Sequence, residues 1–377
     1  MNTREINSNQ LMVLMALFIL EGPGLTNAVR AGGQNAWIHL LFSGVIGCLL
    51  FTVYYRISKL HQHQGLPDIL KNCFGKWLGS FLIVVYGGFF LFRSIMVGNI
   101  MSNKAQETLM HGAPHRLVII LLLGAIMFGS LYGLRAIGRS AEILFFIIIV
   151  CTILFCVSAS SPKVFKLDNL RPLLEYGIQD LKENVFRDLV FFYGDLIVFL
   201  AMLQYVSKKQ KKDILKRSYF AIIIGTLILI VISVVTVAIL GSSLTQSFTT
   251  PFYHAMQVAG ASGLLNRLDP LAIFIIVVSA YFRIIVYFYA AILAIQSLSQ
   301  KFNFKWTLWF VSIGIFLASP YIKIGVHFQY QTVPFKILPV FSLALPSLMW
   351  IVSEIKNYRK AKNLALTQKS IFQETRP

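Results

Sequence analysis

The chain has 377 residues, of which 56% are hydrophobic and only 13% are charged. That charged fraction is roughly half the share found in soluble domains, and the mean hydropathy of +0.70 also excludes an ordinary soluble protein. The formal net charge is +19, but the basic residues cluster between apolar segments, a pattern typical of membrane topology rather than of a nucleic-acid groove. We therefore predict an all-α integral membrane protein that binds no nucleic acid.

Ten segments are long and apolar enough to cross a bilayer, which takes roughly 20 residues. They are residues 11–29, 37–57, 77–100, 116–134 and 141–159, then 185–206, 219–240, 270–298, 306–324 and 335–355. Lys and Arg gather in the connections on one side, above all in the run KKQKKDILKR at 208–217. This bias predicts that both termini are cytoplasmic. The first segment is too long for a signal peptide and has no small-residue cleavage site, so we expect no cleaved leader.

The first segment carries polar and helix-breaking residues at its centre. Glu21 is followed by Gly22, Pro23, Gly24 and Leu25. A carboxylate at this depth costs at least ~2.5 kcal/mol, Pro removes a backbone donor, and Gly weakens the helix. Irregular backbone at membrane depth is tolerated only where protein or a water-filled cavity satisfies it. We predict that this helix is broken and that the break faces a cavity.

Five segments followed by five more place the second half in the membrane in the opposite sense, as in inverted-repeat transporters. We predict one transmembrane domain over residues 1–377, with repeats at 9–159 and 185–355. An extracellular connector at 160–184 separates them, and a basic, loosely ordered cytoplasmic tail occupies 356–377. The outer connection at 241–269 contains a helix-like patch at 252–258. The symmetry predicts a second broken helix in the sixth segment, where Tyr193, Gly194 and Asp195 lie at the centre.

Four charged residues lie at mid-span, where such residues are rare and usually functional. They are Glu21, Arg93, Asp195 and Arg283. In the eighth segment, Ser279, Arg283 and Tyr287 follow each other at helical spacing and share one face. Two interpretations remain open: buried ion pairs that fix helix packing, or a polar cavity that receives the carboxylate and ammonium groups of a ligand. The rarity of charge in lipid favours the cavity.

The sequence contains no pattern that predicts an enzyme. The seven His residues form no ligand pair across a helix, and no phosphate-binding glycine loop or Ser/His/Asp arrangement is present. The four Cys residues are scattered without a CxxC motif and are expected to be buried thiols. We predict no catalytic residue, no metal and no cofactor.

Short motifs, taken in their order along nearly the whole chain, resemble a known family, the membrane-embedded B subunit of spore germinant receptors in the amino acid–polyamine–organocation superfamily. The motifs are SNQL (8–11), AGGQNAWI (31–38), FGKWLGSFL (74–82), GL (133–134), GRSAEILF (138–145), DNLRPLL (168–174), FYGDLIVFL (192–200) and NRLDPLAIF (266–274). Two positions depart from the family pattern. Asn35 stands where the family usually has Asp, and Asp195 stands where it usually has Glu.

The resemblance implies a leucine-transporter-like fold of ten helices in a 5+5 inverted repeat, with helices 1 and 6 broken. It also implies a germinant sensor in the inner membrane of a dormant spore, surrounded by membrane lipids. The implied partners are a larger A subunit and a lipoprotein C subunit. The implied ligands are small nutrients, commonly amino acids and sometimes nucleosides or sugars.

The leading hypothesis is a receptor subunit that binds a small germinant between the two breaks and signals through partner subunits. Gly22 and Gly24 would offer backbone amides, and Asp195 or Glu21 would hold an ammonium group. Arg93 or Arg283 would pair with those acids or meet a carboxylate; the sixth-segment residues Tyr193 and Gly194 complete the predicted site. The alternative is an amino acid transporter coupled to protons or sodium. A third possibility is a structural subunit, or a passage for ions.

Overall fold

The computed structural model describes residues 5–20, 28–108, 114–162, 164–173, 177–262, 268–298, 303–319, 321 and 328–374. Almost all of these residues are helical. Within these ranges the one β contact is an isolated bridge between Ile6 and Val206. The prediction of an all-α protein is therefore confirmed.

Helices occupy the first five predicted segments. They are α1 (Ser8–Ile19), the 3-10 turn η1 (Gly33–Asn35) with α3 (Ala36–Leu60), α4 (Leu66–Thr108), α5 (His115–Leu131) and α6 (Leu134–Ala159). α4 extends beyond its predicted segment at both ends. Gly75 interrupts its helical backbone with a φ of 82°, a conformation that Gly adopts without steric cost. The residues from Leu66 up to Gly75 therefore form a separate short helix at one end of the spanning part.

The second half is less regular than the first. Its elements are η2 (Leu167–Leu170), α7 (Gly177–Asp188), η3 (Leu189–Tyr193), η4 (Gly194–Ala201), η5 (Leu203–Tyr205), η6 (Lys208–Asp213), α8 (Ile214–Ser247), α9 (Pro251–Ser262), α10 (Asp269–Leu298), α11 (Phe304–Ala318), η7 (Phe328–Ile337), η8 (Val340–Ala344) and α12 (Leu345–Glu374). α9 includes the helix-like patch predicted in the outer connection. The sixth predicted segment begins with the last turn of α7 and continues from Leu189 as short π and 3-10 pieces instead of one α-helix.

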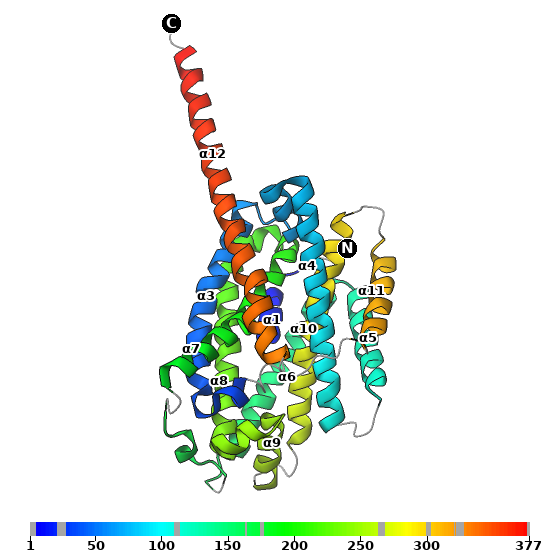
Figure 1. Ribbon diagram of the computed structural model, residues 1–377, viewed down its shortest axis with the longest axis vertical. Helices are drawn as coiled ribbons and strands as arrows, with labels where there is room; N and C mark the ends of the chain where they lie inside the picture. The colour runs from blue at the N-terminus through cyan, green and yellow to red at the C-terminus, as the bar shows by residue number, and fades with distance from the viewer. Residues whose placement is uncertain are drawn as a thin grey trace.

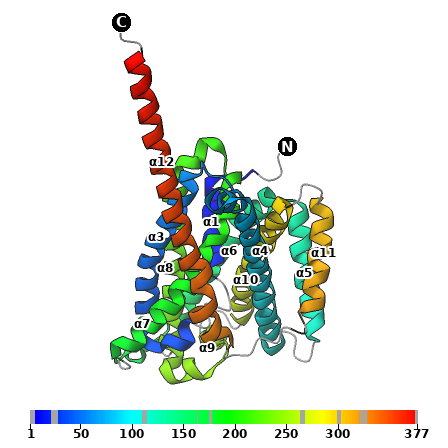
Figure 2. The ribbon, with the colours of Figure 1, turned by 45° about the horizontal axis from the view of Figure 1, so that its top comes forward.

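The C-terminal tail differs from its prediction. We expect a loosely ordered end from its composition, yet α12 continues as one helix to Glu374, and its end projects beyond the bundle (Figures 1 and 2). The reason is compositional, because residues 347–374 contain neither Gly nor Pro and are rich in good helix formers such as Lys, Leu, Ala and Gln.

α10 runs through the interior of the bundle (Figure 1) and packs along α4, and α1 contacts both α8 and α6. α3 and α8 lie on one side of this centre, and α5 pairs with α11 on the other. Both ends of the chain lie toward the same end of the bundle (Figure 2). Ile6 pairs with Val206, which ties the stretch before α1 to the end of the sixth segment.

Burial separates the central helix from the peripheral ones. Every residue of α10 from 282 to 294 is buried, whereas the outer helices expose large apolar side chains such as Phe128, Phe146 and Phe310, each at least 64% exposed. Large exposed apolar surfaces of this kind face lipid in a membrane protein. Among the described residues, six helices are long and apolar enough to span a bilayer, and α1, α5 and α11 are shorter apolar helices. The chain is thus a multi-pass membrane protein, while its division into two five-helix repeats stays a prediction.

Candidate functional site

The middle of the sixth segment changes from a π-helix to a 3-10 helix between Tyr193 and Gly194. Such π turns are uncommon and often lie at functional sites. The chain stays coiled through Gly194, which has φ −60° and ψ −40°. The predicted break is therefore a change from a π-helix to a 3-10 helix. At this change, backbone carbonyl oxygens accept hydrogen bonds from side chains of other helices. The carbonyl oxygen of Phe191 accepts from Arg283 at 2.6 Å, and that of Gly194 accepts from Tyr54 Oη at 3.0 Å.

Two arginines from different helices converge on the carboxylate that follows this change. Asp195 Oδ2 accepts from Nη2 of Arg93 (α4) at 2.5 Å and from Nη2 of Arg283 (α10) at 2.6 Å. Charged hydrogen bonds of this length are among the strongest in proteins. We call Arg93, Asp195 and Arg283 the Asp195 cluster. It joins three spans at the centre of the bundle.

Aromatic rings and further acceptors surround the two guanidinium groups. The Arg283 guanidinium lies 4.5 Å from the ring centroid of Phe18, and that of Arg93 lies 5.0 Å from the ring centroid of Phe191, both within the range of cation–π attraction. Arg93 Nε also donates to Tyr287 Oη at 3.3 Å. Arg283 Nη1 donates to the carbonyl oxygen of Phe18 at 3.1 Å. Both cations are therefore held in fixed positions.

The Asp195 cluster is closed to solvent and lipid in this conformation, because all three side chains are 0% exposed. Burying charges costs several kcal/mol per ion unless hydrogen bonds compensate. One atom of the cluster can still accept a hydrogen bond, since Asp195 Oδ1 has no hydrogen-bond partner among the residues that the structure describes. A buried carboxylate oxygen of this kind calls for a donor, which a water molecule or a ligand can supply.

The structure brings together four of the predicted site residues: Arg93, Asp195, Arg283 and Tyr287. Ser279 shares the helix of Arg283 and Tyr287, but its hydroxyl donates to the carbonyl oxygens of Ile275 and Ile276. Its side chain is therefore used within its own helix and not in the Asp195 cluster.

The predicted residues of the first break are Glu21, Gly22, Pro23, Gly24 and Leu25, and all five lie outside the described residues. α1 ends at Ile19, and the description resumes at Ala28. Their part in the site remains a prediction.

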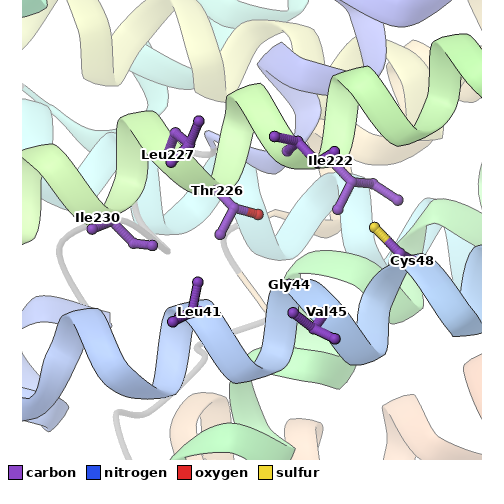
Figure 3. Close-up of a pocket in the computed structure, with 9 residues that line it drawn as sticks. Leu41, Gly44, Val45, Cys48, Ile222, Thr226, Leu227 and Ile230 are labelled. Carbon is purple, nitrogen blue, oxygen red and sulfur yellow. The ribbon is translucent and has the colours of Figure 1, made fainter.

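Tyr193 points away from the Asp195 cluster, toward α8. Its hydroxyl lies 2.7 Å from that of Thr226, and its ring packs against Gly47 of α3. Thr226 and Gly44 also line an apolar groove of about 110 Å³ between α3 and α8 (Figure 3). Besides the Thr226 hydroxyl, Figure 3 shows aliphatic side chains and the thiol of Cys48, and Val45 on the rim is 59% exposed. The groove therefore suits lipid and not a charged ligand, and Tyr193 acts as a packing residue.

Gly194 is a close-contact position. A Cβ atom there would lie 2.8 Å from both Cβ and Oγ of Ser342 in η8, closer than real Cβ contacts. Glycine thus allows the sixth and tenth segments to approach each other beside Asp195. This packing explains why glycine stands at this position, and its role in ligand binding stays a prediction.

Sequence reasoning missed two buried polar contacts near the site. Tyr54 Oη lies 3.0 Å from the carbonyl oxygen of Gly194 and 2.6 Å from that of Ser342, so it links the sixth and tenth segments. His39 of α3 pairs with Asp188 at the end of α7, and both are buried. The available signals were a Tyr within the second apolar segment, an Asp at the start of the sixth segment and a His in the second. None of them reveals which carbonyl or partner lies opposite.

Replacing Tyr54 by Phe should lower the stability of the protein by about 1–3 kcal/mol, because two buried carbonyl oxygens lose the single hydroxyl proton that they share. Thermal denaturation of the detergent-solubilised protein measures this loss. Tyr132→Phe is the control, since Tyr132 follows the last residue of α5 and is 58% exposed. Equal midpoints for the two variants would show that the Tyr54 hydroxyl does not hold the two segments together.

Comparison with solved structures defines the class of fold. The chain is similar to Mhp1, a nucleobase-cation-symport-1 family transporter in a closed conformation with bromovinylhydantoin bound, with a TM-score of 0.67 and 13% identity over 92% of this chain and 78% of that one. It is also similar to a mutant of the manganese transporter of Eremococcus coleocola, with a TM-score of 0.62 and 14% identity over 92% of this chain and 75% of that one. The protein therefore has a leucine-transporter-like fold, as predicted. At this identity the likeness concerns the fold alone.

Sequence comparison defines the family. The spore permease model, described as spore germination protein, matches residues 5–325. The chain is 24% identical to spore germination protein KB of Bacillus subtilis (strain 168) over 96% of this chain and 98% of that protein. It is also 24% identical to spore germination protein A2 of the same organism over 82% and 84%. The chain belongs to the spore germination protein family, and the predicted resemblance is confirmed. These relatives and structural neighbours are germination proteins and transporters, which agrees with the prediction of a protein that is not an enzyme.

Proposed function

We propose that this protein is the membrane-embedded subunit of a nutrient germinant receptor, and that it binds a small germinant carrying an ammonium group at the Asp195 cluster. Family membership supports a role in spore germination, and the transporter-like fold supports a ligand site at the membrane midplane. An amino acid is the ligand class that fits best, because it presents both an ammonium group and a carboxylate.

The observation that carries this proposal is the buried Oδ1 atom of Asp195. It has no partner within the described ranges, and it lies on the same carboxylate that two arginines hold in place. An ammonium group would donate to Oδ1. The faces of Phe191 and Tyr287, which already contact Arg93, would attract the same charge.

A ligand can reach the Asp195 cluster only if the protein changes conformation, because all three side chains are fully buried in this structure. A germinant therefore competes with the existing contacts and favours a conformation in which the sixth segment has shifted against α4 and α10. A ligand can change the population of two states only by the difference between its affinities for them. Contacts made or broken at Asp195 supply that difference.

In this proposal the conformational change passes to an A subunit and to a lipoprotein C subunit in the inner membrane of the spore. The basic connections and the projecting end of α12 would then face the cytoplasm. Figure 2, in which both chain ends lie toward the same end of the bundle, is compatible with this orientation.

Spores that carry this receptor as their only nutrient receptor should germinate with an amino acid and not with its N-acetyl derivative, because acetylation removes the ammonium charge that Asp195 would bind. Loss of refractility, measured across single nutrients and their N-acetyl derivatives, is the readout. Spores without any nutrient receptor are the control. Equal germination with both forms, or germination with neither, would contradict the proposal.

The second candidate function is an amino acid transporter driven by protons or sodium, which the similarity in fold to Mhp1 favours. Uptake of labelled amino acid into vesicles containing this chain alone separates the two. Accumulation that follows an ion gradient would support transport, whereas saturable binding without accumulation would support the receptor.

A further inference from the structure

The guanidinium group of Arg283 binds the backbone of the first and the sixth segment at once. Its Nη1 donates to the carbonyl oxygen of Phe18 at 3.1 Å, in the last turn of α1. Its Nη2 donates to the carbonyl oxygen of Phe191 and to Asp195 Oδ2, both at 2.6 Å. Three oxygen atoms from two segments therefore surround one fixed positive charge.

Transporters use a similar set of oxygen atoms to bind the cation whose gradient drives transport. In inverted-repeat transporters, carbonyls released by irregular backbone and by half-helix C-termini coordinate Na⁺ or a proton carrier. The C-terminal end of a helix also favours a cation through its dipole. We propose that Arg283 occupies this position permanently, as a built-in cation, and that the protein binds no inorganic monovalent cation there.

The burial of Arg283 and the hydrogen bonds that it already makes support this assignment. Arg283 is fully buried, and its guanidinium lies 4.5 Å from the Phe18 ring centroid and 5.2 Å from that of Phe191. Arg93 already shares the Oδ2 atom of Asp195. A metal cation would need the same three oxygens, and all of them already accept hydrogen bonds from Arg283.

The consequence for ligand response rests on the proposed function. Because the positive charge at this site is the side chain of Arg283, a sodium gradient cannot drive a conformational change there. The response to a germinant would then be the same in Na⁺, K⁺ and choline salts. This behaviour suits a sensor that works in a dormant cell, and it argues against the sodium-driven form of the transporter.

The test is the thermal denaturation midpoint of the purified, full-length protein in NaCl, KCl and choline chloride at equal ionic strength. Wild-type protein should show the same midpoint in all three salts. A saturable rise with Na⁺ that choline does not produce would overturn the inference, because any ligand of the native state raises the midpoint.

Variants at position 283 test the inference from the opposite direction. In Arg283→Ala the three oxygens lose their cation, so the midpoint should fall in choline chloride and recover saturably with Na⁺, Li⁺ or methylguanidinium. A folded Arg283→Ala protein that no cation stabilises would overturn the inference. If this variant does not fold, Arg283→Gln, which keeps a neutral amide donor, is measured in the same way. Arg56→Ala is the matched control, because the ion pair between Arg56 and Glu354 is exposed and its loss should create no cation dependence.

The outcomes separate this inference from the proposed function. If spores carrying the receptor respond to no amino acid while the purified protein is insensitive to Na⁺, the proposed function fails and the built-in cation stands. If spores respond to amino acids only when Na⁺ is present, and the purified protein is stabilised by Na⁺, the proposed function stands and the inference fails.

Discussion

Replacing Asp195 by Asn should strongly reduce the amount of this protein in the membrane and lower its thermal stability. The variant keeps the shape of the side chain but removes the negative charge that Arg93 and Arg283 share. Removing one partner of a buried ion pair costs about 3–5 kcal/mol, because it leaves buried charge uncompensated. Immunoblots of spore membranes and denaturation midpoints of the solubilised protein measure the loss.

Two control variants separate the loss of negative charge at Asp195 from a change in side-chain shape and from the general effect of removing an acidic residue. Asp195→Glu keeps the charge and adds one methylene, so it should cost only about 1–3 kcal/mol through overpacking. Glu354→Gln removes the acid of the exposed pair with Arg56, whose atoms lie 2.7 Å apart, and should cost at most ~1 kcal/mol. An Asp195→Asn protein as abundant and as stable as wild type would show that the carboxylate charge does not hold the three spans together.

The sequence predicts the helical class and most spanning segments because long apolar runs and basic connections leave few alternatives in a membrane. It also identifies Arg93, Asp195 and Arg283 as exceptional, because mid-span charge is rare. The structure shows that these three residues meet. The sequence does not predict which acid each arginine contacts, because Glu21 and Asp195 are both possible partners.

Other features depend on which side of a helix faces which neighbour, and no pattern along the chain determines this. Tyr193 lies close to Asp195 in sequence, yet it points to Thr226 on α8. Tyr54 was one aromatic residue among many until the structure placed its hydroxyl between two carbonyls. The π and 3-10 pieces of the sixth segment could not be predicted either. Gly194 indicated a weakness in the helix, but the resulting geometry is set by tertiary contacts with Arg283 and Tyr54.

For the C-terminal tail, the prediction of loose order is wrong. Its polar and basic composition suggested loose order, although its residues are good helix formers and no helix breaker interrupts them before Glu374. Local helix propensity continues α12 beyond the end of the apolar segment. Propensity and burial are separate signals, and a helix that leaves the membrane needs only the first.

Replacing Gly47 by Ala should destabilise the protein and displace the sixth segment, although the change adds only one methyl group. A Cβ atom at Gly47 would lie 2.5 Å from Cγ and 2.8 Å from Cβ of Tyr193, distances that real Cβ contacts do not reach. Tyr193 cannot simply rotate away, because its hydroxyl is held 2.7 Å from that of Thr226 and the residue is fully buried. Overpacking of this kind costs about 1–3 kcal/mol.

The displacement matters because Tyr193 is separated from Asp195 by one residue. A shift of the Tyr193 backbone moves the carboxylate relative to Arg93 and Arg283, so Gly47→Ala should weaken the response to a germinant as well as the stability. Gly88→Ala in α4 is the matched control, since a Cβ atom there meets nothing within 4 Å and Ala favours a helix over Gly by roughly 0.5–1 kcal/mol. It should leave the denaturation midpoint unchanged or raise it. If both glycine variants matched the wild type in midpoint and in germinant response, close packing of α3 against Tyr193 would have no part in positioning Asp195.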